Sequence, residues 1–168
     1  MMSQMTRPSL LGIISDTHDN VANIIKAVSI FRKKKVNMVI HLGDIVAPGT
    51  VKFFKGAKML FVLGNCDGDI IHIKEEAEKI KGKFVGNVAD FEFAGKLFLA
   101  VHNPDCLMAT AINSQRFDYI LHGHTHKKKD EKHGRTRVIN PGAHYYLCEN
   151  TIAILNAEND RLEFIKVS

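Results

Sequence analysis

The fold is decided first by residues 10–19, which read LLGIISDTHD. An apolar, β-branched run of this length is typical of a buried strand, and two residues that can bind metal, Asp16 and His18, follow it directly. Side chains alternate along an extended backbone, so residues two apart can project to the same side. The stretch therefore predicts a buried strand that presents Asp16 and His18 together at its carboxyl end.

Four further apolar runs repeat this arrangement along the chain. They end in Asp44 after residues 38–43, in Asn65 after 59–64, in His102 after 97–101, and in His124 and His126 after 119–123. In open α/β sheets, ligands gather outside the carboxyl ends of the strands. We therefore expect seven metal-binding side chains at one rim of the protein.

The donor types indicate what this rim can hold. Two divalent ions roughly 3.5 to 4 Å apart can clamp an in-line displacement on phosphorus, and such a pair needs a ligand that touches both ions. Asp44 stands alone as a carboxylate after Gly43, and a carboxylate has the two oxygens that bridging requires. Imidazole suits transition metals. We expect two divalent transition-metal ions per chain, with Mn as first choice and Ni, Fe or Zn as alternatives.

Length and composition favour one domain. With 168 residues, of which 45% are hydrophobic, we expect a frayed tail over residues 1–8 and a single domain over 9–168. No apolar run approaches the roughly 20 residues of a membrane helix, and residues 1–9 lack the apolar centre of a signal peptide. Cys66, Cys106 and Cys148 form no CxxC pattern, which fits a reducing compartment. We expect a cytoplasmic protein without a membrane partner.

The net charge of +5 raises the question of a polyanionic partner. The basic residues concentrate in 32–35 and 127–129, and neither run is interleaved with aromatic residues. Solvated surface is therefore favoured over a nucleic-acid face, although the second run follows His126 and can add positive potential near the site. The sequence leaves the oligomeric state open, and a homo-oligomer is compatible with it.

The pattern of elements predicts an α/β fold. We expect Asn20 to cap a helix over 20–31 that buries Val21, Ile24, Ile25, Val28 and Phe31. Further elements are expected as strands over 36–42 and 58–63, a short helix over 50–54, a hairpin of 88–94 and 96–101, a helix over 105–114, and strands over 118–121, 135–139, 151–156 and 162–167. An α/β half followed by a β-rich half predicts two packed sheets with helices outside.

Five blocks in this order resemble one known family. They are Asp16-x-His18, Gly43-Asp44, residues 64–67 (GNCD), His102 and residues 123–126 (GHTH), with 140–142 (NPG) as a terminal turn. This pattern is similar to the calcineurin-like metallophosphoesterase superfamily, and specifically to its small single-domain prokaryotic phosphodiesterase branch. The resemblance implies an αββα sandwich of two mixed sheets flanked by helices. It also implies a metal-dependent hydrolase of phosphate esters.

The resemblance further implies a role for each ligand. One metal would be held by Asp16, His18, Asp44 and His126, and the other by Asp44, Asn65, His102 and His124. A metal-bridging hydroxide would attack the phosphorus of a phosphodiester, with a monoester as the less favoured substrate. Through the metal that they hold, Asn65 and His124 would also stabilise the charge that develops on the phosphoryl oxygens.

The chain departs from the family pattern in two places. Larger members carry a histidine where Cys66 stands, and a His-Gly-His block where residues 102–104 read His-Asn-Pro. The first departure concerns help to the leaving group, and the second concerns contacts with the substrate. Neither removes a metal ligand.

Several neighbouring residues have alternative interpretations. Asp19 and Asp67 can each orient a histidine ligand or simply shape a loop. Gly43, Gly64 and Gly123 are expected to let the backbone turn sharply before the ligands, and Gly142 to supply a positive φ. Five histidines outside the pattern are expected to be structural or exposed, with His122 facing inward; they are His41, His72, His122, His133 and His144.

Two rival functions remain open at this point. One eukaryotic retromer subunit resembles the same small branch and acts as a protein-binding scaffold with a degraded metal site, whereas all seven ligand positions are filled here. A nuclease is the second rival, which the basic charge supports. The complete ligand set favours the enzyme over the scaffold.

Overall fold

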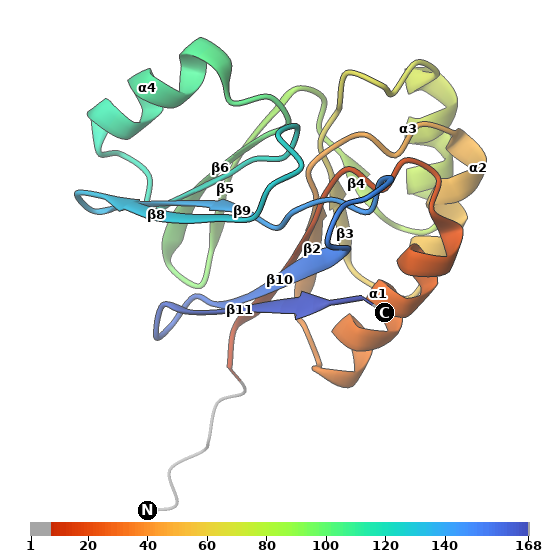
Figure 1. The fold of residues 1–168 in the computed structure, drawn as a ribbon, viewed down its shortest axis with the longest axis horizontal. Coiled ribbons are helices and arrows are strands. Elements are labelled where there is room, and N and C mark those ends of the chain that lie inside the picture. Colours follow the sequence, from red (N-terminus) through yellow and green to blue (C-terminus); the bar gives the residue numbers. More distant parts are fainter. Residues whose placement is uncertain (1–7, 168) are drawn as a thin grey trace, which may run out of the picture.

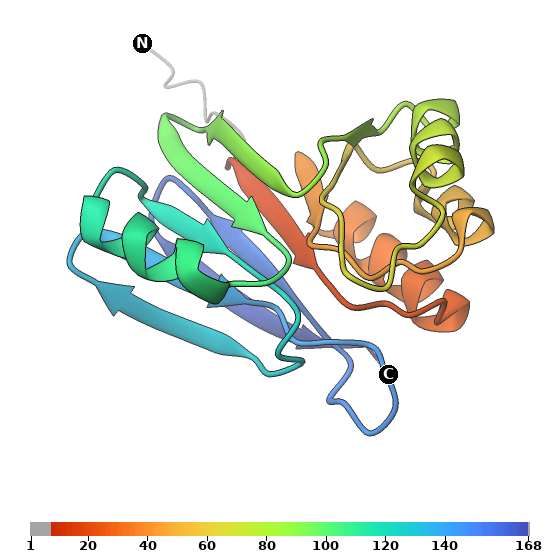
Figure 2. The same cartoon turned by 90° about the horizontal axis from the view of Figure 1, so that it is seen from above.

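Two mixed β-sheets pack face to face, with α1, α2 and α3 outside one sheet and α4 outside the other (Figures 1 and 2). This computed structural model describes residues 8–167, so the expected tail over residues 1–8 lies almost wholly outside the described residues. The αββα sandwich expected from the sequence is confirmed.

The first sheet has the strand order β11-β10-β1-β2-β3-β4. Its strands are β1 (Leu10–Ile14), β2 (Met38–His41), β3 (Met59–Phe61), β4 (Lys83–Phe84), β10 (Thr151–Asn156) and β11 (Arg161–Lys166). The strands β1 to β4 run parallel, while β10 is antiparallel to both of its neighbours. The last two strands of the chain thus complete the sheet that the first strand begins.

The second sheet has the order β5-β6-β7-β9-β8. Its strands are β5 (Val88–Phe93), β6 (Lys96–Val101), β7 (Tyr119–Leu121), β8 (Lys129–His133) and β9 (Thr136–Asn140). The expected hairpin is formed by β5 and β6, and β6, β7 and β9 run parallel. Each sheet therefore has parallel strands at its centre, whose carboxyl ends can share one rim.

The helices are α1 (Val21–Lys33), α2 (Pro48–Val51) with a 3-10 turn at Lys52–Phe54, α3 (Ile70–Lys79) and α4 (Asp105–Ser114). Asn20 caps α1, because its side chain accepts from the N–H of Asn23. The expectation that Ile25 is buried is wrong: Ile25 is 50% exposed, and Ala27 packs in the core instead. The side chains of Ile24, Ala27 and Phe31 form the stripe that faces the sheet, so Ile25 lies beyond its edge.

Three elements were not expected from the sequence. The helix α3 buries only Ile73 and Ala77, so its apolar stripe is too narrow to stand out. The strand β4 has two residues, and β8 is a charged edge strand, KDEKH, without a buried face. The strand β4 pairs with β3 on the other side of α3, whereas β8 pairs with β9, which follows it closely in the sequence.

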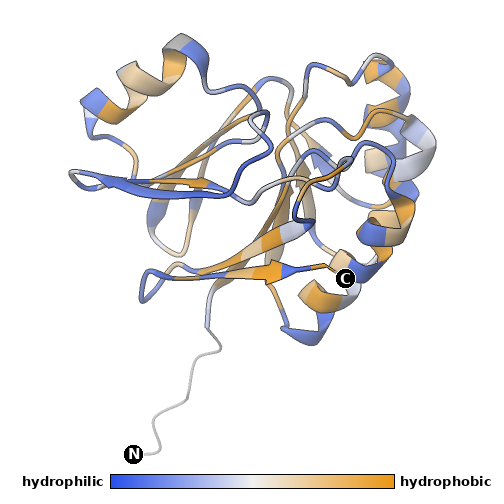
Figure 3. Cartoon of the chain, in the orientation of Figure 1, coloured by the Kyte–Doolittle hydropathy of each residue, from blue (hydrophilic) through white to orange (hydrophobic). Residues whose placement is uncertain are grey.

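The core consists of three apolar layers. One lies between the first sheet and α1 to α3, one lies between the two sheets, and one lies between the second sheet and α4. Figure 3 shows the hydrophobic residues concentrated in the central strands, while hydrophilic residues cover much of the loops. Among the described residues, no helix is long and apolar enough to cross a membrane.

Candidate metal centre

The structure brings the seven ligand-type residues to one rim, where the parallel strands of both sheets end. Asp16 and His18 follow β1, Asp44 follows β2, Asn65 follows β3, His102 follows β6, and His124 and His126 follow β7. The parallel strands of both sheets thus end at the same rim, as predicted from the ligand-type residues that follow each apolar run.

Four of these residues form a compact group. Asp16, His18, Asp44 and His126 each offer one ligand atom, and these atoms all lie within 4.8 Å of one another. Nε2 of His126 lies 3.2 Å from Oδ1 of Asp16. Nε2 of His18 lies 3.5 Å from Oδ2 of Asp44. This geometry suits a single cation between two carboxylates and two imidazoles.

The chemistry of this group fits a metal ion. Within residues 8–167, Oδ1 of Asp16 and Nε2 of His18 are buried and have no hydrogen-bond partner. Burial raises the pKa of Asp16 above its ordinary value, which shows how unfavourable its negative charge is without a nearby cation. A buried carboxylate without compensation is costly, and a divalent ion supplies that compensation.

A second group lies beside the first. Nε2 of His102 is 2.9 Å from Oδ1 of Asn65, and Nδ1 of His124 is also 2.9 Å from that oxygen. Nε2 of His102 lies 3.4 Å from Oδ1 of Asp44. Asp44 therefore turns Oδ1 to this group and Oδ2 to the first. That is the position a carboxylate shared by two metal ions would occupy.

The ring of His102 is oriented for this role. Its Nδ1 lies 2.7 Å from the main-chain oxygen of Leu42 and donates to it, so Nε2 faces Asn65 and Asp44. Burial acts to lower the pKa of His102, but the carboxylates of Asp44 and Asp16 outweigh it and raise the pKa. The two carboxylates thus favour the protonated, positively charged form of the His102 ring.

The backbone at the site is strained. Five of the seven ligand-type residues have a positive φ, with values of 51° at Asp16, 40° at His18, 60° at Asp44, 65° at His124 and 59° at His126. Residues other than glycine adopt this region at a cost, and such residues cluster at functional sites. No local sequence signal marks this conformation. It gives independent support to the assignment of the rim as the functional site.

Asp67 holds two of the ligand loops together. Its Oδ1 accepts from the N–H groups of Ile45 and Val46, and its Oδ2 accepts from those of Asp44 and Gly64. Among the described residues, the hydrogen bonds of the Asp67 side chain all come from main-chain N–H groups and none from a histidine. The alternative, that it shapes a loop, is what the contacts support, because main-chain N–H groups converge on its buried carboxylate.

Asp19, like Asp67, connects two loops through hydrogen bonds to its carboxylate. Its Oδ1 accepts from the N–H of Ala47 at 3.0 Å and from the hydroxyl of Thr50 at 2.5 Å. Its carboxylate ties the first ligand loop to α2, which supports the alternative that Asp19 shapes a loop.

Ser15 is a site residue that the sequence analysis missed. Its hydroxyl donates to Oδ2 of Asp16 at 2.5 Å, and the N–H of His124 donates to the same oxygen at 3.1 Å. These bonds fix the carboxylate so that Oδ1 faces His126. The only sequence signal was that Ser15 precedes a ligand at the end of a buried strand.

Glycine is required for different reasons at the three positions that precede ligands. Gly43 has a φ of 94°, which confirms the expected turn. For Gly64 and Gly123 φ is not positive, so a sharp turn is not what requires glycine. A Cβ at Gly64 would collide with Asp44, and one at Gly123 would collide with Ser15. Both glycines allow one ligand loop to approach another closely.

The 140–142 turn also supports a ligand loop. Gly142 has a φ of 89°, as expected. The buried side chain of Asn140 accepts from the N–H of Gly142 and donates to the main-chain oxygen of Gly123 and the hydroxyl of Thr125. Asn140 therefore fixes the loop that carries His124 and His126, while Gly142 lines a groove beside His126.

Cys66 lies at the edge of the second group. Its N–H donates to Oδ1 of Asp44 at 2.8 Å, and its Sγ accepts from Nδ2 of Asn65 at 3.3 Å. Desolvation and the neighbouring Asp44 raise the pKa of the Cys66 thiol to about 11. Next to His102, the side chain of Asn103 bonds with Asp105 in a turn, so this turn occupies the place of the family's second histidine.

The five histidines outside the pattern lie as expected, either buried or near the surface. His41, His122 and His144 are buried, so His122 does face inward. His72 is exposed and pairs with Asp69, and His133 pairs with Glu131.

Tyr145 was not expected near the site, yet its ring centroid lies 4.5 Å from that of His18 and 5.9 Å from that of His126. Nothing in its local sequence marks that position.

The basic runs are partly neutralised by glutamates. Lys34 pairs with Glu163, Lys128 with Glu149, and Lys129 with Glu131. These pairs reduce the positive potential that either run offers to a polyanion, which agrees with the interpretation of solvated surface.

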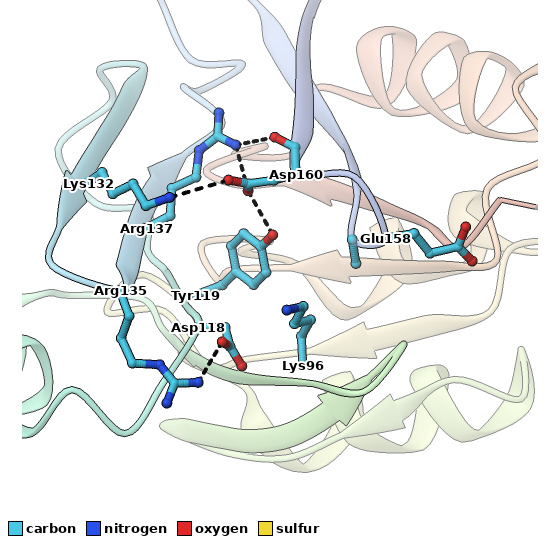
Figure 4. Close-up of a pocket in the computed structure, with 9 residues that line it drawn as sticks. Lys96, Asp118, Tyr119, Lys132, Arg135, Arg137, Glu158 and Asp160 are labelled. Atoms are coloured by element: carbon cyan, nitrogen blue, oxygen red, sulfur yellow. Dashed lines mark hydrogen bonds and ion pairs between the residues drawn. The ribbon is translucent and has the colours of Figure 1, made fainter.

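A small polar cavity lies at the opposite end of β6 and β7 from the ligands. It has a volume of about 150 Å³ and is lined by residues such as Lys96, Tyr119 and Arg135 (Figure 4). Arg137 pairs there with Asp160, to which the hydroxyl of Tyr119 also donates. The charges of this cavity largely compensate one another and link the two sheets. Within residues 8–167, its carboxylates form no group close enough to hold a metal ion, unlike those at the rim.

Comparison with known proteins agrees with this geometry. Residues 10–160 match the model of the calcineurin-like phosphoesterase superfamily domain. The chain is 34% identical over 154 residues to Phosphodiesterase MJ0936 of Methanocaldococcus jannaschii, covering 88% of this chain and 93% of that protein. A solved structure described as a novel archaeal phosphodiesterase superposes with a TM-score of 0.88 at 34% identity, covering 94% of this chain and 99% of the other.

More distant structures share the fold alone. The phosphoesterase Yfce from E. coli has a TM-score of 0.70 at 16% identity and covers 95% of this chain and 100% of its own. A variant of Vps29 from Entamoeba histolytica has a TM-score of 0.63 at 13% identity, with coverage of 95% and 99%.

Proposed function

Because the chain belongs to the calcineurin-like phosphoesterase superfamily, a family of metal-dependent hydrolases of phosphoric esters, we propose that it is a phosphodiesterase with two divalent metal ions. The observation that carries the proposal is the position of Asp44, which turns one oxygen to each of two groups of ligand atoms. The 34% identity to an archaeal phosphodiesterase supports a diester rather than a monoester as substrate. The activity would reside in one domain over residues 9–168.

In this proposal the residues divide as follows. Asp16, His18, Asp44 and His126 would hold one ion, and Asp44, Asn65, His102 and His124 would hold the other. Bound divalent ions would supply hydroxide at neutral pH to attack phosphorus and would neutralise the phosphoryl oxygens. The nitrogen-rich donor set favours Mn, Fe, Ni or Zn over Mg or Ca.

The side chains of the rim would do the remaining work. Asn65 and His124 lie exposed at the rim, and they would stabilise the charge that develops on a phosphoryl oxygen through the metal ion that they would hold. The hydrogen bonds of Asp67, Ser15 and Asn140 keep the ligand loops in place before the substrate arrives, which reduces the reorganisation needed during the reaction.

The test is hydrolysis by the purified protein loaded with Mn²⁺. We expect turnover of bis(4-nitrophenyl) phosphate above that of 4-nitrophenyl phosphate, and its loss on addition of a chelator. His126→Ala and Asp16→Asn should each lower turnover by about 100-fold or more, since each removes a ligand. His72→Ala is the matched control, because His72 is exposed and pairs only with Asp69.

The scaffold function makes the opposite prediction. If the metal-loaded protein hydrolyses neither ester while its circular dichroism is that of a folded protein, the phosphodiesterase proposal is wrong. The complete ligand set, with its buried unpaired atoms at Asp16 and His18, supports the enzyme.

A further inference from the structure

A groove opens directly beside the second ligand group. It has a volume of about 340 Å³, and Asn65 and His102 form part of its lining. Its other walls come from the ends of three strands and from α4. They carry the apolar side chains Leu63, Val88, Val101 and Leu107 and the uncharged amides of Asn87 and Asn103. The groove and the ligand group are therefore continuous.

The apolar walls are partly open to solvent. Val88 is 45% exposed and Leu107 is 39% exposed, although both are large aliphatic side chains. A single exposed aliphatic residue needs no explanation, but two that face one groove beside a polar site provide an apolar binding surface.

The groove differs from its neighbour in charge. Among the described residues, no Lys, Arg, Asp or Glu lines it. On the other side of the site, the groove next to His126 contains Lys127, Lys128 and Glu149. A neutral group would therefore favour the groove beside His102, since it would displace water from apolar walls without burying a charge.

The geometry points to a binding site for an uncharged planar ring carried on the substrate's phosphate, either an aryl group or a nucleobase. This inference rests on the proposed function, because the phosphate must lie at the ligand groups for a substituent to reach the groove. Cavities of about 150 Å³ can hold a benzene ring. A groove of about 340 Å³ thus has room for a ring and its linker.

Binding measurements test the inference with two phosphonates, which cannot be hydrolysed, and two phosphate monoesters, whose release of inorganic phosphate is checked after each titration. Calorimetry of the Mn²⁺-loaded protein would compare phenylphosphonate with methylphosphonate, and adenosine 5′-monophosphate with ribose 5-phosphate. We expect the ligand that carries the ring to bind about tenfold more tightly in at least one pair. The first pair reports an aryl group on the phosphate, and the second reports a nucleobase.

Variants locate the effect in the groove. The double variant Val88→Ser with Leu107→Ser should reduce the preference for the ring to less than about twofold, while the affinity for methylphosphonate or ribose 5-phosphate stays the same. Ile25→Ser is the matched control, because Ile25 is 50% exposed on α1, away from the groove, and should keep the full preference.

The outcomes separate this inference from the proposed function. If methylphosphonate and ribose 5-phosphate bind but neither ring adds affinity, or if the preference survives in the double variant, the inference about the groove is wrong. If none of the four ligands binds the metal-loaded protein, the proposed function fails and the inference fails with it.

Discussion

The main-chain N–H of Asp44 donates to Oδ2 of Asp67 over 3.1 Å, so the residue that would bridge two metal ions is held by the carboxylate of the following ligand loop. The same carboxylate accepts from Ile45, Val46 and Gly64. One buried side chain therefore fixes the two loops that carry Asp44 and Asn65. This arrangement predicts that loss of the Asp67 carboxylate lowers the stability of the fold.

Asp67→Asn should destabilise the protein by about 2 to 4 kcal/mol, because an amide offers one acceptor oxygen and turns its NH₂ group toward N–H donors. Urea unfolding followed by circular dichroism would measure the free energy of unfolding. Asp69→Asn is the control in the same loop, since the 52% exposed side chain of Asp69 caps α3, as an asparagine also can, and its pair with His72 is exposed. Equal losses in the two variants would contradict the role assigned to Asp67.

Gly64→Ala should cost several kcal/mol of stability or prevent folding, because its Cβ would collide with the main chain of Asp44. Gly68→Ala should change the free energy of unfolding by less than about 1 kcal/mol, since no atom lies within 4 Å of the added carbon. The two substitutions are chemically identical and four residues apart. A tolerated Gly64→Ala would show that the two loops can separate without cost.

Metal content should follow the division of ligands. We expect two ions per chain in protein reconstituted with excess Mn²⁺ or Zn²⁺ and analysed for elements. Asp44→Asn should weaken both sites, because Asp44 faces both groups, while His102→Ala should weaken chiefly one. His72→Ala should retain both ions. A single ion in the unsubstituted protein would disprove the binuclear centre.

Cys66 should contribute little to turnover on activated esters. A thiol is a weak hydrogen-bond donor, so it gives a departing alkoxide little help, and a nitrophenolate needs none. Cys66→Ala should therefore change hydrolysis of a nitrophenyl diester less than about twofold. Cys66→His should raise the rate selectively on substrates that leave as alkoxides. Steady-state rates of the three proteins on both substrate types decide this; a large loss in Cys66→Ala on the activated ester would show that the thiol takes part.

Asp160 links the two sheets in a pH-dependent way. Burial acts to raise its pKa, but bonds with Arg137 and Tyr119 outweigh this and lower the pKa. A lowered pKa means that the carboxylate stabilises the fold above its unfolded pKa of about 3.9, and that this contribution is lost as the pH falls below it. Asp160→Asn should therefore cost stability at pH 7 and progressively less below about pH 4.

The size of that effect is limited by solvent. The side chain of Asp160 is 44% exposed, so we expect a loss of only about 1 kcal/mol at pH 7. Asp90→Asn is the control, because Asp90, on β5 of the second sheet, forms an exposed pair with Arg116. Urea unfolding of both variants from pH 3 to pH 7 would measure the difference. A loss from Asp160→Asn that does not depend on pH would contradict the charge-based explanation.

The sequence by itself determined the central strands, the cap at Asn20 and the seven donors of the rim. The physical reason is that these features are local: buried runs are apolar, side chains alternate, and ligands follow strand ends. The sandwich was implied by the family resemblance of blocks such as Gly43-Asp44. Elements with little apolar surface of their own, such as α3 and β8, could not be found in this way.

Only the tertiary structure decided how the donors meet. The partners of Asp67 and Ser15, the close approach at Gly64, and the position of Tyr145 beside His18 all join residues from different loops. Such contacts depend on how two sheets pack and on backbone strain, including the positive φ of Asp44. A local sequence pattern reveals neither of these features. Every residue except proline has the same main-chain N–H group, so the sequence does not show which of these groups converge on one carboxylate and shape a loop.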